Sequence, residues 1–329
     1  MTIPGNVTRR AFLGSTAAGV FAASRLLNAE DAKPALISIT LDLEMSRNFP
    51  QWETTHWDYE KGNLDAATKD YTVEACRRVK EKGGVIHCFS VARVLEQEDV
   101  SWLKAIIADG HPVGNHTYDH VYVLATKPED VQFRFKRAPW LMRGRPPQEV
   151  IADNIAMASE AIKTRLGVDP AGFRTPGGFA EGLTGREDVQ KMILKAGFKW
   201  ASCRYPSHTM SKPGERATPE VYKGIVAAQA AAQPFVYPTG LIEIPMSPVS
   251  DINAFRTGRW PLEDFLEAIR QAVTWCIDNG ATFDFLAHPS CLGVADPQFK
   301  AVELICDLVA KAGNRAKLVP LDALAARAK

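Results

Sequence analysis

Stretches rich in β-forming residues alternate with helical stretches from residue 35 to the end of the chain. The first β-rich run is 35–41 and the next is 85–89. A helical stretch, 66–82, fills the interval between them, and Gly83-Gly84 ends that helix. A strand followed by a helix, repeated along a chain, is typical of parallel strands joined by crossover helices. We therefore predict an α/β fold.

The same alternation continues without a tandem repeat or an obvious linker. Further helices are predicted at 100–108, 149–166, 187–196, 262–279 and 298–312, and further strands near 172–173, 241–244 and 282–286. One domain, 33–329, is therefore expected after a leader. The stretches 122–145 and 206–238 are interpreted as loop insertions that form the walls of a cleft.

The charged residues nearly balance, because 39 Lys and Arg oppose 38 Asp and Glu and give a formal net charge of +1. A broad basic face for nucleic acid or an acidic tail would shift this balance. No apolar run reaches the ~18 residues that a membrane-spanning helix needs. We expect a globular enzyme or binding protein with no nucleic-acid partner and no stable membrane insertion.

Residues 1–32 have the pattern of an export signal. Arg9 and Arg10 directly precede the weakly apolar stretch 11–23, and small residues follow. This order is typical of secretory signals, and the arginine pair before Phe-Leu resembles the twin-arginine signal. A general secretory signal and a surface amphipathic helix stay open. We expect cleavage near 29–32, export by the twin-arginine machinery and a periplasmic or extracellular location.

The cysteines are predicted to be buried thiols. None forms a C-x-x-C pair, which disfavours a structural zinc site, and most lie in apolar patterns, where free Cys behaves as a small hydrophobic residue. One or two disulfides stay open for an oxidising compartment. The six are Cys76, Cys88, Cys203, Cys276, Cys291 and Cys306.

The segment H-T-Y-D-H places His116 and His120 at i and i+4. Two histidines at this spacing on a helix share one face and can bind one metal ion. The H-E-x-x-H motif of zinc proteases carries its general base between the histidines. No glutamate stands there in this chain, so a base must come from elsewhere. Two histidines that share the spacing by chance are the alternative.

Two carboxylates, Asp42 and Glu44, end the first predicted strand. Residues at i and i+2 of a strand point to the same face. A pair of carboxylates at one point suits one metal ligand and one general base, because a shared site separates their pKa values. A solvated strand edge is the alternative.

Arg174 and His288 each stand at the end of another predicted strand. An arginine can hold a carboxylate through two N–H groups, and the glycines that follow Arg174, Gly177 among them, expose N–H groups to an anionic transition state. Taken singly, an ordinary turn arginine and a satisfied histidine at the core edge are the favoured interpretations. Polar residues that follow parallel strands gather at the carboxyl ends of those strands, so we expect one shared site.

In this order, the segments resemble the motifs of the NodB-homology polysaccharide deacetylase family, carbohydrate esterases that remove N- or O-acetyl groups. T-L-D from Thr40 resembles the start of T-F-D-D, H-T-Y-D-H matches H-[ST]-x-x-H, R-T-P resembles R-x-P, and L-A-H-P matches L-x-H-P. The resemblance extends from residue 35 to residue 294 and implies a distorted (β/α) barrel.

The resemblance also implies a metal-assisted hydrolysis. Asp42 would be the general base, Arg174 would orient Asp42, and His288 would protonate the leaving amine or alcohol. The N–H of Gly177 would join the metal in binding the oxyanion.

The first motif departs from the family pattern. The family has two adjacent aspartates, the base and then a metal ligand, whereas Leu43 follows Asp42 here. Glu44 faces the same side as Asp42 and takes the ligand role, together with His116 and His120. Zinc is the default divalent metal, with cobalt, nickel or iron as alternatives. D-x-E variants occur in atypical branches, some of which act on small amides or have lost the metal.

The fourth motif departs as well. Residues 197–200 resemble it, and Trp200 is predicted to bind substrate with Trp52 and Trp57 of an aromatic-rich loop. Aromatic rings of this kind stack on sugars or anchor loops. The carboxylate that tunes the catalytic histidine in the family is absent from 201–204.

The predicted function is removal of acetyl groups from a polysaccharide by a metal-dependent hydrolase of non-peptide carbon–nitrogen bonds. A hydrolase of a small linear or cyclic amide and a non-catalytic glycan-binding protein on the same fold are the alternatives. The oligomeric state is not predicted.

Overall fold

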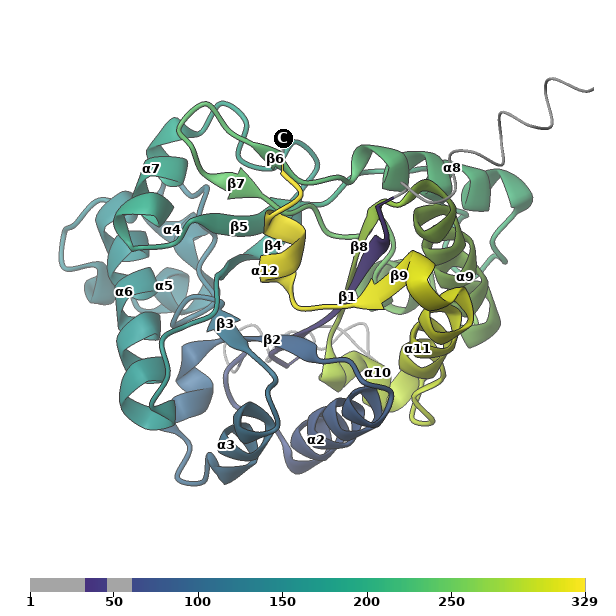
Figure 1. Ribbon diagram of the computed structural model, residues 1–329. Helices are drawn as coiled ribbons and strands as arrows, with labels where there is room; N and C mark the ends of the chain where they lie inside the picture. The colour runs from purple at the N-terminus through teal and green to yellow at the C-terminus, as the bar shows by residue number, and fades with distance from the viewer. Residues whose placement is uncertain (1–32, 46–60, 329) are drawn as a thin grey trace, which may run out of the picture. The chain divides into compact units, whose positions relative to one another are not determined.

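The computed structural model describes residues 33–45 and 61–328 (Figure 1). Within these residues nine strands form one curled sheet in the order β6-β7-β5-β4-β3-β2-β1-β8, and β9 pairs with the start of β1. Paired strands are parallel except β6 and β7. The strands are β1 (Ala35–Leu43), β2 (Ile86–Ser90), β3 (Val113–Asn115), β4 (Phe173–Phe179), β5 (Trp200–Arg204), β6 (Phe235–Val236), β7 (Ile242–Glu243), β8 (Thr282–Ala287) and β9 (Ala316–Leu318).

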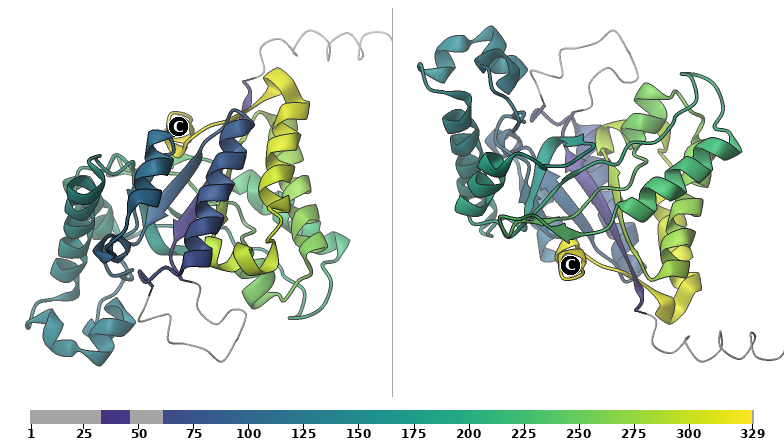
Figure 2. Two further views of the ribbon diagram at one scale, coloured as in Figure 1. Left: turned by 90° about the horizontal axis from the view of Figure 1, so that it is seen from below. Right: turned by 90° about the horizontal axis from the view of Figure 1, so that it is seen from above.

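Helices fill most of the connections and lie on the outside of the curled sheet, as Figure 2 shows. The distorted (β/α) barrel predicted from the sequence is confirmed. The longer helices are α2 (Ala66–Glu81), α3 (Ser101–Ala108), α6 (Pro147–Leu166), α7 (Glu187–Lys195), α8 (Pro219–Ala231), α9 (Leu262–Asn279) and α11 (Lys300–Ala312). Shorter ones are α4 (Pro128–Val131), α5 (Phe133–Arg137), α10 (Pro289–Ala295), α12 (Leu321–Ala325) and the π-helix η4 (Ile252–Thr257).

The predicted elements agree with the observed ones where the hydrophobic pattern is strong. Helix α9 has the predicted bounds, and α2 ends one residue before the predicted end. The two stretches interpreted as loop insertions are partly helical, because they hold α4 and α5 in one case and α8 in the other. Helices α4 and α5 are too short to show a periodic hydrophobic pattern, so the sequence gives little sign of them.

The segment that follows β7 connects the two edges of the curled sheet. Ile244 N donates to Ala201 O of β5 at 2.9 Å, and Ser247 N donates to Asp284 O of β8 at 2.9 Å. The main chain therefore crosses from β5 to β8 before it reaches η4. This crossing brings the start of η4 beside the end of β8.

Alternate residues of the central strands point to opposite faces. In β1, Ile37, Ile39 and Leu41 point outward into a large apolar core with α2, α9 and α11. Thr40 and Asp42 are buried on the inner face, where they contact Arg174. The barrel interior is therefore partly polar, unlike the outer core.

The amino end of the barrel interior is apolar. Leu36, Phe89 and Trp200 cluster there with Leu321 and Leu324 of α12, which lies across this end in Figure 1. A Cβ on residue 172 would come within 2.0 Å of the Trp200 ring, and Gly172 has φ +79°, so only glycine fits.

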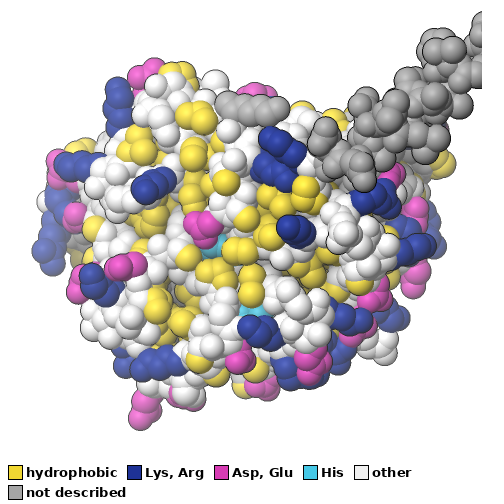
Figure 3. Space-filling view, in the orientation of Figure 1, with side chains coloured by type: hydrophobic (Ala, Val, Ile, Leu, Met, Phe, Trp, Pro, Cys, Tyr) yellow, Lys and Arg dark blue, Asp and Glu magenta, His cyan; other side chains and the backbone are white. Residues whose placement is uncertain are grey.

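The surface shows no concentration of one charge on the face seen in Figure 3. Lys, Arg, Asp and Glu side chains are spread around the rim, and apolar side chains gather toward the middle. None of the described helices combines the length and apolar character that crossing a membrane requires. All six cysteines are buried and free, as the sequence predicts for thiols in apolar patterns.

Candidate active site

Four segments that follow or end strands meet at the carboxyl end of the barrel. Asp42 and Glu44 come from the end of β1, His116 follows β3, and His288 follows β8. These four side chains, Asp42, Glu44, His116 and His288, line a cavity of about 710 Å³. Arg174 of β4 lies beneath the cavity and is fully buried. The structure thus brings together the residues that the sequence predicts to share one site.

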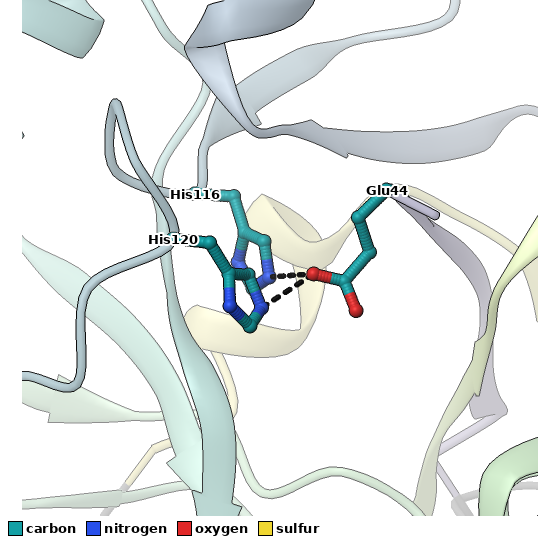
Figure 4. Close-up of side chains that lie close together, drawn as sticks. All are labelled: Glu44, His116 and His120. Atoms are coloured by element: carbon teal, nitrogen blue, oxygen red, sulfur yellow. Dashed lines mark ion pairs between the residues drawn. The ribbon is translucent and has the colours of Figure 1, made fainter. Parts of the chain in front are cut away.

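Glu44, His116 and His120 could hold a metal ion. Their ligand atoms lie within 4.8 Å of one another. Both imidazoles present Nε2 to the same oxygen, Oε2 of Glu44, at 3.9 Å for His116 and in a closer ion pair for His120 (Figure 4). Two histidine nitrogens and one carboxylate oxygen are a common set of ligands for a catalytic zinc or related divalent ion.

The two histidines do not share a helical face, which corrects the expectation from their spacing. Residues 116–120 form a loop, and Thr117 and His120 have φ of 60° and 58°. Buried hydrogen bonds hold this loop, since Thr117 Oγ1 accepts from Val121 N and Asn154 Oδ1 accepts from Asp119 N. A strained backbone persists only where its surroundings fix it, so this loop is built to aim the imidazoles.

His116 is fixed in the form that a metal ligand needs. Its Nδ1 donates to Arg174 O at 3.0 Å, so Nε2 keeps its lone pair toward the cavity. Burial lowers the pKa of His116 to about 4, although Asp42 acts in the opposite direction. The ring is therefore neutral over the physiological range.

Glu44 is held as a carboxylate. Burial opposes its ionisation, but His120 and Lys61 outweigh burial and hold the pKa of Glu44 well below its usual value. Lys61 Nζ donates to Oε1 at 2.7 Å. Oε2 is buried and accepts no hydrogen bond from the described part of the chain. A buried carboxylate oxygen that accepts no hydrogen bond and faces two imidazoles is suited to bind a metal ion.

Asp42 has one restrained oxygen and one that faces the cavity side. Arg174 Nη1 donates to Oδ1 at 3.0 Å, while Oδ2 lies 3.7 Å from His116 Nε2. The two-handed grip expected of Arg174 is not made on Asp42, because Nη2 pairs with Asp284 instead.

His288 has a carboxylate partner that lies far from it in sequence. Asp251 Oδ1 is 2.9 Å from His288 Nδ1, and Asp251 Oδ2 accepts from the backbone N–H of His288 at 2.7 Å. Burial alone lowers the pKa of His288, but Asp251 beside the ring more than compensates, and the pKa of His288 is raised. Asp251 therefore supplies the carboxylate that is absent from 201–204.

The predicted substrate-binding residues lie in different places. Gly177, with φ +76°, lines the cavity. Trp200 does not: it is buried in the apolar cluster at the amino end, where its Nε1 donates to Asp322 at 2.9 Å. A role for Trp200 in substrate contact is therefore corrected to a packing role. Trp52 and Trp57 lie outside the described residues.

Three site residues were missed by the sequence reasoning. Lys61 and Asp251 belong to no motif. Asp284 stands inside a predicted strand, and the signal that could have found it is a charged residue among the apolar residues of β8. A buried acid inside a strand requires a partner, and Arg174 is that partner.

Comparison with known proteins gives a family match over part of the chain and a shared fold. Residues 63–199 match the polysaccharide deacetylase family. A structure from Mycobacterium smegmatis described as a polysaccharide deacetylase is 15% identical, with 90% of each chain covered and a TM-score of 0.57. One from Pseudomonas aeruginosa PAO1, described in the same terms, is 13% identical, with 91% of this chain and 92% of that chain covered and a TM-score of 0.59.

A third solved structure, Puue allantoinase, is 13% identical, with 91% of this chain and 92% of that chain covered and a TM-score of 0.61. No curated protein matches this chain in sequence. Identities this low carry the fold alone, and the family match covers 63–199. Over residues 63–199 the chain is therefore similar to the polysaccharide deacetylases, and its first motif, which precedes that stretch, is an atypical D-x-E.

Proposed function

We propose that this protein is an exported, metal-dependent deacetylase. Its reaction would be hydrolysis of the acetyl amides, or the acetyl esters, of a glycan. One observation carries the proposal. A single cavity is lined by a three-residue ligand set, by a carboxylate with one oxygen facing the ligand set and by a histidine paired with a buried acid.

The metal would be held by Glu44, His116 and His120, whose donor set suits zinc and also cobalt, nickel or iron. When bound, such an ion polarises an acetyl oxygen and makes water more acidic. The protein prepares the site, because the buried neutral imidazole of His116 and the ionised Glu44 need no further proton loss to bind a cation.

Two residues of the chain move protons. Asp42 takes a proton from the attacking water at Oδ2, since Oδ1 is occupied by Arg174. His288 gives a proton from Nε2 to the leaving nitrogen or oxygen, and Asp251 holds the opposite ring nitrogen. The two groups enter the cavity from β1 and β8, which are neighbouring strands.

The substrate is proposed to be an acetylated glycan outside the cytoplasm. The cavity also carries aromatic and polar side chains that could contact a sugar, among them Phe133 and Tyr205. The sequence pattern of residues 1–32, with its arginine pair, supports transport by the twin-arginine machinery and an extracytoplasmic location; these residues lie outside the described ones.

A small cyclic or linear amide is the second candidate substrate. The likeness of the fold to an allantoinase favours including it, as does the D-x-E first motif. A glycan-binding protein without activity is the third possibility to test.

The test combines metal content with acetate release. Purified protein is analysed for bound metal and incubated with N-acetylated glycans, O-acetylated glycans and small amides. We expect zinc or a related ion at one per chain and acetate from a glycan. His116→Ala should lose the metal, whereas the control His208→Ala, whose ring binds backbone carbonyls away from the cavity, should retain it.

Each alternative has its own outcome. Ammonia or ring opening from a small amide without acetate release would assign the second candidate. Glycan binding without any product would assign the third. Acetate released from protein stripped of metal would contradict the metal dependence.

A further inference from the structure

We propose that Asp284 is a positioning residue for the reaction: it takes one side of the Arg174 guanidinium, so that Asp42 is held by a single N–H and keeps its other oxygen for the attacking water. This inference rests on the proposed deacetylase function and adds to it a second buried acid that does not touch the substrate.

Asp284 lies in the middle of β8, inside the barrel, and its side chain is almost fully buried. Its Oδ1 accepts a hydrogen bond from Thr40 Oγ1 at 2.8 Å. Its Oδ2 accepts from Arg174 Nη2 and from Ser202 Oγ, the latter at 3.3 Å. Among the described residues that line the cavity, Asp42 is present and Asp284 is not. Asp284 can therefore act on the reaction only through its partners.

Arg174 is fixed from several sides. Its guanidinium carbon lies 4.5 Å from the centre of the Phe89 ring. Nε and Nη2 lie 3.3 Å and 3.1 Å from Ser202 Oγ. Nη1 donates to Thr40 Oγ1 at 2.7 Å and to Asp42 Oδ1 at 3.0 Å. The two terminal nitrogens thus serve two different carboxylates.

The division of the Arg174 guanidinium between Asp42 and Asp284 matters because one buried cation faces two acids. Burial raises the pKa of Asp284 to about 6, although Arg174 opposes the increase, so near neutral pH the side chain is mostly ionised. Without its charge, Arg174 would have one anionic partner and would turn both terminal nitrogens to it, since a paired guanidinium prefers two parallel bonds to one carboxylate. Asp42 would then be held at both oxygens, and neither oxygen would be left for the attacking water.

The substitution Asp284→Asn in the full chain tests this division. Asparagine keeps the size, and its carbonyl can still accept an N–H. We expect kcat for acetate release, measured on an acetylated glycan or on 4-nitrophenyl acetate, to fall by about 10- to 50-fold, with KM and bound metal within about twofold of the wild type. A role in folding alone would lower the amount of active protein and leave kcat per folded molecule unchanged.

Asp264→Asn is the matched control. Asp264 is also a buried acid that binds an arginine, Arg216, but neither residue lines the cavity. This variant should lose stability without losing kcat. Thr40→Val is a second variant, because it removes the hydroxyl that bonds both Asp284 and Arg174; a loss of about threefold in kcat is expected.

A crystal structure of Asp284→Asn decides the inference independently of activity. We expect both terminal nitrogens of Arg174 on Asp42. An Arg174 that keeps its place, or an unchanged kcat, would overturn the role of Asp284. If the wild type releases acetate from no substrate, the proposed function fails, and the position of Arg174 in the variant still tests the division of the guanidinium.

Discussion

His87 at the amino end of the barrel and His288 at the carboxyl end are both buried, yet their ring nitrogens face different partners. His87 Nε2 donates to Ala171 O at 2.6 Å, and its Nδ1 accepts from Leu321 N at 3.3 Å. His288 faces a carboxylate, Asp251, on one side and the cavity on the other.

The electrostatic result is opposite at the two ends. Burial lowers the pKa of His87 to about 4, so that ring stays neutral and serves packing. The pKa of His288 is raised, because Asp251 outweighs the effect of burial. The comparison teaches that burial alone favours the neutral imidazole, and that a buried anionic partner favours the imidazolium, the form that has a proton to give.

The largest effect is expected at the carboxyl end of the barrel, from Asp42→Asn. This change removes the proposed base but keeps its shape, so kcat should fall on the order of 10³-fold while the bound metal stays. Acetate release and metal analysis on the same preparation check both parts. Full activity on a verified substrate would show that another group is the base.

Asp251→Asn should convert His288 toward the state of His87. The neutral side chain no longer favours the imidazolium, so burial lowers the pKa of His288. Because the acid must be protonated to act, the alkaline limb of the kcat–pH profile should move to lower pH, and kcat near neutral pH should fall by about 10- to 100-fold.

A kcat–pH profile with thermal unfolding as the control tests this prediction. An alkaline limb that stays in place would mean that His288 is not the titrating acid. A drop in kcat at every pH by the same factor would indicate misplacement of the ring rather than a change in its proton affinity.

His87→Ala tests the amino end of the barrel. It leaves Leu321 N and Ala171 O without their partner and opens a cavity beside Phe89, so the free energy of unfolding should fall by about 2–3 kcal/mol. The kcat per folded molecule should not change. Urea unfolding together with titration of active protein separates the two effects, and a loss of kcat would link the two ends.

Trp200→Phe should have the smallest effect. It removes the hydrogen bond from Nε1 to Asp322 and part of the ring packed on Gly172, at a cost of about 1 kcal/mol in stability. KM for the glycan should be unchanged, because Trp200 lies in the apolar cluster. An increase in KM would restore the sugar-binding role that the sequence suggests.

The sequence predicted the barrel and most of the site because both depend on local patterns. Strand-ending polar residues such as Asp42 and His288 stand out against apolar strands, and parallel strands place such residues at one edge. The helical prediction for His116 and His120 was wrong, because hydrogen bonds that Asn154 Oδ1 and Thr117 Oγ1 accept from the backbone hold a loop that the spacing alone cannot indicate.

The residues that escaped prediction act through distant partners. Asp251 lies 37 positions from His288, and the main chain reaches it only after crossing from β5 to β8. Trp200 was misplaced for a related reason. The resemblance assigned it to the substrate, whereas its place at the start of β5 puts its ring at the apolar end of the barrel.

The six buried thiols can report the local opening of the elements that carry them. They are distributed over α2, β2, β5, α9, α10 and α11. A thiol reagent reaches such a group only when the element around it opens. Single-cysteine versions of the chain would therefore give labelling rates element by element, and would show whether strands β2 and β5 open before the helices that carry the other thiols.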